Sequence, residues 1–470
     1  MNKRLRISQC MIVKNEEKNI EKALSWGKDL FWEQIVVDTG SSDRTVEIAR
    51  QMGAQVYYFS WIDDFAAAKN YAIDQAKGDW IAFLDADEYM EAEDGARIAA
   101  MLERWTAGAE NERVSKTIAI LTAWVNLEDD GSVMAHGSQL RFFQNRKDLR
   151  YRGRIHEALY LDGHCLSESD WLDAVGEVTI YHTGYAKSVA GEGQKAERNR
   201  RILEKELAER PDDPSLMGYL GDTCRSKGEN EEAIACYEKA IGVLPFPPDE
   251  GWPDEDTRTC RNFVNLLLLL CQEKEEENER IRRTYEKALL YFPGEADLEY
   301  ILGNYYVRRG DYKEAGRHLE RCLDVFERTG NSHHGVYLFA NLFGVWENLA
   351  VCYFNEGELG KCVNTCVGCL KERPLHMGIL KVLLLAFRAD AERYARELAQ
   401  AETLASVKPL PAASGKQVLD FLGKLYDFGS LRDRLFIRKA AAETEYAELS
   451  WALRSLFSAE ELEMIERSGK

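Results

Sequence analysis

The stretch "GDWIAFLDADEYM", residues 78–90, changes abruptly from apolar to acidic side chains. Its apolar half predicts a strand buried on both faces, and Asp85, Asp87 and Glu88 follow directly. A buried parallel strand ends where its carboxyl edge meets solvent, and open α/β sheets bind ligands along that edge. Two aspartates two residues apart could hold a divalent cation there through oxygen atoms. A solvated strand end before an acidic helix N-terminus explains the same residues, so the rest of the chain must decide.

The composition limits the class of protein. A chain of 470 residues has room for at least two domains, and a hydrophobic content of 45% is ample for packed cores. The net charge of −19 argues against a nucleic-acid partner or an anionic membrane. The N-terminus lacks the pattern of a signal peptide, and the longest apolar run, residues 263–271, is too short to span a bilayer. Eleven scattered cysteines fit a reducing compartment, so we expect a cytoplasmic protein.

Strand-like and helix-like segments alternate four times through the first hundred residues. The strand-like segments are residues 7–15, 33–38, 54–61 and 80–84. Short helical connections between them predict βαβ units and a parallel sheet, in which right-handed crossovers place the strand ends on one edge. Those ends carry Asn15 and Glu16, then Asp38, then Asp63 and Asp64, then Asp85 and Asp87. The pattern indicates a nucleotide and metal crevice, while the absence of G-x-G-x-x-G and of a P-loop argues against a dehydrogenase or a kinase-like NTPase.

Four segments resemble, in order and spacing, the motifs of family 2 glycosyltransferases with the GT-A fold. They are "MIVKNEEKNIEKAL" (11–24), "VVDTGSSDRTVEIA" (36–49), "DFAAAKNYA" (64–72) and "WIAFLDADE" (80–88). The resemblance implies an α/β catalytic domain over residues 1–190 with a mostly parallel, Rossmann-like sheet. It also implies a nucleotide-sugar donor, with uridine diphosphate favoured, and Mg²⁺ or Mn²⁺ bridging the diphosphate.

The resemblance gives the acidic strand ends their expected roles. Asp87 becomes a metal ligand and Asp85 a contact to the ribose and phosphate, while Asp38 and Glu16 contact the nucleoside. Lys69 becomes a diphosphate partner in a position where relatives often show arginine. The full set of expected nucleotide-sugar contacts is Asn15, Glu16, Asp38, Asp64, Lys69, Asp85 and Arg154.

Residues 117–186 carry further strand-like runs and two notable motifs, "YRGRIHEAL" (151–159) and "YHTGY" (181–185). Placed just before a helical region, this pair is similar to the sublancin-type peptide glycosyltransferases, which attach a sugar to a cysteine or serine side chain of a peptide. The resemblance implies that His182 completes the metal coordination. The alternative is a buried histidine hydrogen-bonded beside two tyrosines.

Inverting transfer needs a group that takes the proton of the acceptor, and His156 and Glu157 are the candidates. On an extended strand these neighbours point to opposite faces, so only one enters the site, whereas both could contribute from a loop. We favour Glu157, because relatives use a carboxylate after the metal motif. The alternatives are His156 as the base and a structural salt bridge between Glu157 and Arg154.

From residue 196 to residue 470 the pattern is helical. Residues 219–245, 301–323 and 346–374 match the tetratricopeptide pattern of small and aromatic positions, and the clear repeats lie within 214–376. Such arrays bind peptides or other subunits, so we expect a peptide or protein acceptor and leave a homodimer open.

Three cysteines in the last repeat, Cys362, Cys366 and Cys369, have the spacing of a radical-SAM iron–sulfur site. Positions i, i+4 and i+7 also lie on one face of a helix, where cysteine is a small apolar residue. We therefore interpret them as core residues of the repeat.

Together these features predict a metal-dependent inverting glycosyltransferase that modifies a serine, threonine or cysteine of a peptide or protein. One alternative keeps the donor but uses a glycan or a lipid-linked acceptor. Another is a repeat scaffold with a silent catalytic domain, against which the intact Asp85, Asp87 and Glu157 argue.

Overall fold

The computed structural model describes residues 5–106, 117–128, 130–183, 192–248, 257–272, 278–329, 336–404 and 413–468. The chain forms two compact units, Met1–Glu229 and Asn230–Lys470. From the sequence we expected a catalytic domain over residues 1–190 and a helical domain from residue 196 onward. The first compact unit also includes two helices beyond the last strand, α6 (Glu192–Glu209) and α7 (Pro214–Ser226).

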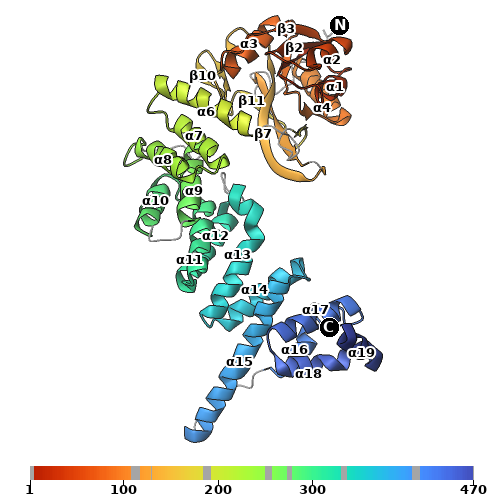
Figure 1. Ribbon diagram of the computed structural model, residues 1–470, viewed down its shortest axis with the longest axis vertical. Coiled ribbons are helices and arrows are strands. Elements are labelled where there is room, and N and C mark those ends of the chain that lie inside the picture. Colours follow the sequence, from red (N-terminus) through yellow and green to blue (C-terminus); the bar gives the residue numbers. More distant parts are fainter. Residues whose placement is uncertain are drawn as a thin grey trace. The chain divides into compact units, whose positions relative to one another are not determined.

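The first unit is organised around a nine-stranded sheet of order β3-β2-β1-β4-β7-β6-β12-β5, with β11 paired to β6 (Figure 1). Its strands are β1 (Ile7–Val13), β2 (Glu33–Asp38), β3 (Gln55–Tyr58), β4 (Trp80–Phe83), β5 (Glu88–Tyr89), β6 (Ala119–Leu127), β7 (Val133–Gln144), β11 (Trp171–Asp173) and β12 (Thr179–His182). Strands β1 to β4 pair in parallel, as predicted. Strand β7 runs antiparallel to both β4 and β6, and β5 antiparallel to β12. The sheet is therefore mixed beyond β4.

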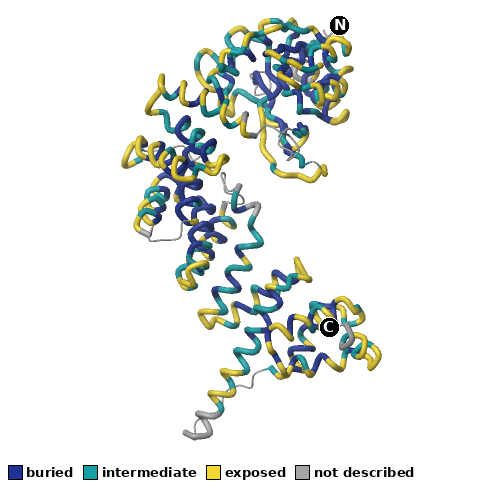
Figure 2. The backbone as a smooth tube through the Cα atoms, in the orientation of Figure 1, coloured by how far each residue is buried: buried dark blue, intermediate teal, exposed yellow. Residues whose placement is uncertain are grey.

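Helices cover both faces of the parallel part of the sheet, which explains why its strands are almost continuously apolar. Cys10 packs in a cluster with residues of α3 (Phe65–Gln75), and its neighbour Met11 packs in another with residues of α1 (Ile20–Ser25) and α2 (Thr45–Gln51). Both side chains are fully buried. Figure 2 shows the buried strands at the centre of this unit. Helix α4 (Ala92–Thr106) packs beside Trp80.

A small antiparallel sheet of order β10-β9-β8 carries the "YRGRIHEAL" motif. Its strands are β8 (Leu149–Arg152), β9 (Ala158–Leu161) and β10 (His164–Cys165). His156 and Glu157 lie in the turn between β8 and β9, so of the two alternatives, an extended strand and a loop, the structure shows the loop. Gly153 and His156 have positive φ angles of 96° and 54°, which turn the chain sharply between the two strands.

The second unit consists of helices in the described residues. They are α8 (Asn230–Gly242), α9 (Thr257–Gln272), α10 (Asn278–Tyr291), α11 (Ala296–Arg309), α12 (Tyr312–Thr329), α13 (Val336–Asn355), α14 (Leu359–Glu372), α15 (Met377–Leu404), α16 (Gly415–Leu422), α17 (Leu431–Glu443), α18 (Ala447–Leu453), the short 3₁₀ helix η1 (Arg454–Leu456) and α19 (Ala459–Ser468). Consecutive helices such as α11 and α12 lie side by side (Figure 1). A Cβ atom on Gly303 would stand 2.6 Å from the Leu319 side chain, so the repeat needs a small residue at this approach.

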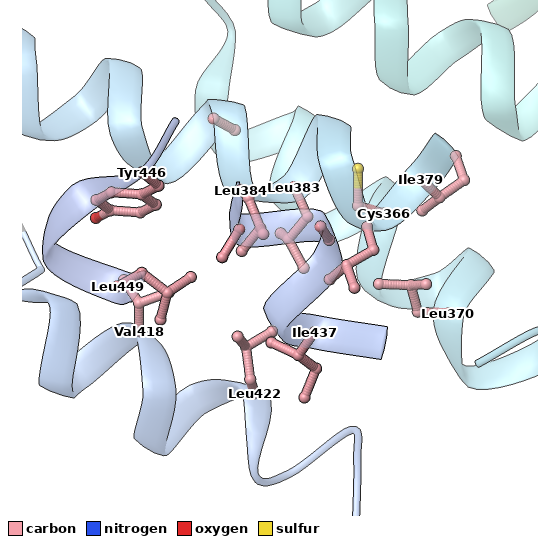
Figure 3. Packing of buried hydrophobic residues seen from close by; sticks show 14 of the residues in the cluster. Cys366, Leu370, Ile379, Leu383, Leu384, Val418, Leu422, Ile437, Tyr446 and Leu449 are labelled. Carbon is pink, nitrogen blue, oxygen red and sulfur yellow. The ribbon is translucent and has the colours of Figure 1, made fainter. Parts of the chain in front are cut away.

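The three cysteines of α14 are free thiols in a hydrophobic core, and this confirms the packing interpretation. Cys362 and Cys366 are fully buried and Cys369 is nearly so. Figure 3 shows Cys366 among leucine and isoleucine side chains of the surrounding helices. Among the described residues, no helix combines the length and the apolar character needed to cross a membrane.

Candidate active site

The carboxyl ends of β1 and β2 are joined by hydrogen bonds between the turns that follow them. Asn15, with a φ of 61°, accepts the Ser42 N–H on its Oδ1 at 2.8 Å and donates its own N–H to Ser41 Oγ at 2.9 Å. The Glu16 N–H donates to Thr45 Oγ1 at 2.7 Å. These bonds hold the predicted nucleoside-binding edge in one conformation.

Asp38, a residue that is only 4% exposed, ends β2. Its oxygens accept the backbone N–H groups of Gly40 at 3.2 Å and Ser41 at 3.1 Å. Asp38 therefore closes the turn after β2. A contact from this carboxylate to a nucleoside stays a prediction, because the same oxygens already accept two backbone hydrogen bonds.

Glu16 lies within electrostatic range of the Asp85 and Asp87 carboxylates. Burial raises the pKa of Glu16, the hydrogen bond from Asn19 at 2.8 Å opposes this, and the charges of Asp87 and Asp85 raise the pKa further. The end of β1 therefore lies near enough to the turn after β4 for the charges of Asp85 and Asp87 to act on Glu16.

Asp85 is held by a buried guanidinium that the sequence analysis missed. Arg141 of β7 places Nη2 3.1 Å from Asp85 Oδ2 and 2.5 Å from Glu88 Oε1. Burial works to raise the pKa of Asp85, but the positive charges of Lys69 and Arg141 outweigh it and hold the pKa below its usual range. The only signal in the sequence was an arginine placed between Leu140 and Phe142.

Glu88, the third carboxylate after β4, is the anchor of this group. The residue is 1% exposed, and its carboxylate accepts the Trp124 Nε1–H at 2.8 Å and the Asp85 backbone N–H at 2.9 Å. Together with Arg141, these bonds fix the turn that carries Asp85 and Asp87.

Asp87 and His182 meet although they are far apart in the chain. Antiparallel pairing of β12 with β5 sets His182 opposite Glu88, and His182 Nε2 then lies 3.3 Å from Asp87 Oδ2. The other ring nitrogen, Nδ1, contacts Asn126 Oδ1 at 2.5 Å, and the Trp124 ring packs on the imidazole. When Nδ1 carries the ring proton and donates it to Asn126, the lone pair of Nε2 points toward Asp87.

The alternative for His182 was a buried histidine beside two tyrosines, and the structure describes only one of these tyrosines, Tyr181. Tyr181 stacks on Tyr89 at 5.4 Å rather than on the imidazole, and Tyr185 lies outside the described residues. No group of three histidine, cysteine, aspartate or glutamate side chains suited to a metal occurs among the described residues. Asp87 and His182 therefore supply two converging donors. A Mg²⁺ or Mn²⁺ shell would take its other ligands from diphosphate oxygens and water, as is usual for Mg²⁺.

Lys69 and Glu157 form a buried ion pair beside Asp85. Lys69 Nζ lies 2.6 Å from Glu157 Oε1, and the two side chains are 6% and 13% exposed. Burial works to lower the pKa of Lys69, but the charges of Glu157 and Asp85 outweigh it and the pKa lies above its usual value. The structure thus brings the expected diphosphate partner and the favoured base into direct contact.

The remaining predicted residues lie at the outer side of this group. Asp64 accepts the Ala67 N–H at 2.8 Å as the N-cap of α3, and its other oxygen lies 3.8 Å from Arg154 Nη1. Arg154 Nη2 contacts Glu209 at 2.7 Å, so Glu157 pairs with Lys69 rather than with Arg154. His156 is exposed and stacks on Tyr219 of α7 at 3.6 Å.

Comparisons with known proteins agree with this architecture. Residues 8–152 match the model of Glycosyl transferase family 2, and residues 217–244 match a Tetratricopeptide repeat. The first match lies where the motifs predicted a family 2 glycosyltransferase domain, and the second lies in the first predicted repeat. Glu157 and His182 lie beyond the matched segment.

Two curated relatives match part of the chain. The chain is 34% identical over 232 residues to a TPR repeat-containing protein of Synechococcus elongatus, which covers 48% of this chain and 54% of the relative. It is 27% identical over 295 residues to the SPbeta prophage-derived glycosyltransferase SunS of Bacillus subtilis, covering 62% of this chain and 64% of SunS. The chain thus spans between half and two thirds of the length of these relatives.

Solved structures show weaker similarity. S. aureus TarS 1-349 in complex with UDP-GlcNAc is 15% identical, with a TM-score of 0.33 over 65% of this chain and 92% of that chain. The TPR protein YrrB is 19% identical, with a TM-score of 0.31 over 40% of this chain and 82% of that chain. Similarity of this degree implies nothing about donor or acceptor.

Proposed function

We propose that the protein is a metal-dependent inverting glycosyltransferase. It transfers a sugar from a nucleotide-diphosphate donor, with a UDP-sugar favoured, to a serine, threonine or cysteine side chain of a peptide or protein. The observation that carries the proposal is one group of side chains at the sheet edge. Asp85 and Lys69 come from the family 2 region, and His182 and Glu157 come from chain beyond it.

The metal role rests on the geometry of Asp87 and His182. Their facing atoms are 3.3 Å apart, and Asn126 orients the imidazole from its far side. A carboxylate and a neutral imidazole suit Mn²⁺ well, whereas Mg²⁺ prefers oxygen ligands. When bound, the cation would offset the negative charge of the diphosphate leaving group.

The base role rests on the position of Glu157. Lys69 holds its carboxylate through the 2.6 Å contact, and the pair adjoins Asp85. A carboxylate fixed beside the metal-binding edge can accept the proton of an acceptor hydroxyl or thiol as that atom attacks the anomeric carbon. His156 faces Tyr219 on the outer side of the turn, which favours Glu157 over His156.

The acceptor class rests on the helical repeats. Helices α10, α11 and α12 enclose a cavity of about 370 Å³, lined by Tyr285, Tyr305, Tyr306 and several arginines. Two of the lining residues are held by Glu299, which accepts the Tyr285 hydroxyl at 2.7 Å and contacts His318 Nδ1 at 2.7 Å. Aromatic rings and guanidinium groups are the side chains that most often anchor bound peptides. The cavity therefore supports a peptide or protein acceptor better than a lipid.

The proposal is tested by following UDP release from UDP-glucose and UDP-N-acetylglucosamine, with and without peptides that contain Ser, Thr or Cys. Glu157→Gln keeps the shape of the side chain and removes the proton acceptor. We expect turnover to fall by about 10²-fold or more, with nearly unchanged donor affinity by calorimetry.

The matched control is Glu168→Gln, the same substitution at an exposed carboxylate, which should turn over like the unmodified protein. Normal turnover of Glu157→Gln together with loss of activity in His156→Ala would make His156 the base. Absence of donor binding and of UDP release with every UDP-sugar would instead favour the scaffold.

A further inference from the structure

The turn that carries Glu157 contains two residues with positive φ angles. His156 has a φ of 54°, which is unfavourable for a residue with a Cβ atom, and Gly153 has a φ of 96°. Such conformations persist only where the surroundings over-determine them. Because His156 is in the left-handed region, its side chain and that of Glu157 point in different directions. Glu157 contacts Lys69, whereas His156 stacks on Tyr219.

Helix α6 binds the first half of this turn. Glu206 is 5% exposed, and its Oε1 accepts the Arg154 backbone N–H at 3.3 Å and the Arg210 Nη2–H at 2.8 Å. Arg154 in turn accepts the Phe65 backbone N–H on its carbonyl oxygen at 2.8 Å. One backbone unit of the turn is therefore bonded to α6 on one side and to the start of α3 on the other. Lys69 lies in the next turn of α3.

Helices α6 and α7 enclose the centre of the turn in an apolar contact. Ile155 is 7% exposed and packs in one cluster with Ile202, Leu203 and Leu216. This cluster buries the side chain immediately between Arg154 and His156. The turn is thus held by the hydrogen bonds of the Arg154 backbone and by the packing of the Ile155 side chain.

Tyr219 of α7 makes a further contact to the turn, through His156. Its ring lies on the His156 imidazole with centroids 3.6 Å apart and planes inclined by 13°. Stacked rings at this separation make extensive van der Waals contact, which stabilises a defined orientation of both. His156 immediately precedes Glu157, so the stack limits how far Glu157 can move from Lys69.

We propose that Tyr219 and Glu206 are positioning residues of the transfer site, acting through the 153–157 turn on Glu157. The inference rests on the proposed role of Glu157 as the base. It assigns α6 and α7 a function distinct from acceptor binding. These two helices hold the catalytic turn in its strained conformation, which explains why they belong to the same compact unit as the sheet.

The test uses the full chain and the UDP-sugar that it hydrolyses fastest. Tyr219→Ala should lower kcat for UDP release by about 10- to 100-fold, because a displacement of about 1 Å at a reacting group costs that much. The KM and calorimetric affinity for the donor should change by less than about 2-fold, because most of the expected donor contacts, among them Glu16, Asp38 and Asp85, lie outside the 153–157 turn. Tyr219→Phe keeps the stacked ring and should restore kcat.

Glu206→Ala should lower kcat in the same way, and Glu204→Ala is its matched control. Glu204 lies on the same helix with a 55% exposed side chain and pairs with Arg200, so its loss should leave kcat unchanged. Hydrogen exchange should be faster over residues 152–158 in Tyr219→Ala and Glu206→Ala, with unchanged exchange in β1 and β4. This readout does not depend on activity.

Wild-type kcat and wild-type exchange in both variants would overturn the positioning role, while a dead Glu157→Gln would still support the proposed function. An active Glu157→Gln would overturn the role of Glu157 as the base, whatever Tyr219→Ala does. If Tyr219→Ala fails to fold, Tyr219→Leu keeps most of the apolar volume without the stack. Unchanged kcat in Tyr219→Leu and Glu206→Ala then contradicts the proposal.

Discussion

Replacing Lys69 with methionine should destabilise the N-terminal unit strongly, because it leaves the Glu157 carboxylate buried without its partner. The charged atoms are 2.6 Å apart, and both side chains are largely buried. With an effective dielectric constant of about 20, Coulomb's law gives an attraction of about 6 kcal/mol at this distance. The cost of removing both charges from water offsets part of that attraction. Breaking such a pair from one side costs about 3–5 kcal/mol, which is the expected fall in the free energy of unfolding.

The assay is hydrogen exchange at increasing denaturant, followed in peptides from β1 and β4 so that only the N-terminal unit is measured. The double variant Lys69→Met, Glu157→Gln should recover most of the lost stability, because no unpaired charge remains. Lys28→Met, at an exposed lysine, is the control and should change the free energy by at most about 0.5 kcal/mol. A loss below about 1 kcal/mol in Lys69→Met, or a double variant no more stable than the single one, would refute the reasoning.

Three further outcomes are expected. Asp87→Ala should abolish UDP release and weaken UDP binding without lowering the melting temperature, and full activity in excess chelator would contradict a metal at this residue. A fragment of residues 1–229 should bind UDP, whereas a fragment of residues 1–195 should aggregate, because it exposes the cluster around Ile155; equal behaviour in light scattering would be contrary evidence. Burial works to raise the pKa of Glu299, but hydrogen bonds outweigh it and the pKa lies below its ordinary value of 4.5. The ionised carboxylate therefore stabilises the fold fully above that value, and the melting-temperature gap between wild type and Glu299→Gln should shrink as pH falls below it.

Much of the fold follows from local patterns in the sequence. Short alternating segments predicted the parallel pairing of β1 with β2 and β4, because right-handed βαβ connections leave little freedom to their arrangement. The spacing of Cys362, Cys366 and Cys369 placed them on one buried helical face, which the structure confirms. The antiparallel insertion of β7 between β4 and β6 was not predicted, since pairing between distant strands leaves no local periodicity.

Local sequence patterns were enough to predict which residue types stand at the carboxyl ends of the strands, because the strand period and the chain direction are local properties. Which of these residues meet depends on the pairing of strands that are distant in the chain. His182 reaches Asp87 through the pairing of β12 with β5, and Arg141 reaches Asp85 through the pairing of β7 with β4. The direction of the Glu157 side chain depends on the left-handed conformation of His156, which no local sequence pattern predicts. Packing of α6 and α7 supplies the contacts that hold this residue, and such contacts join segments too far apart in the chain for any window of sequence to contain both.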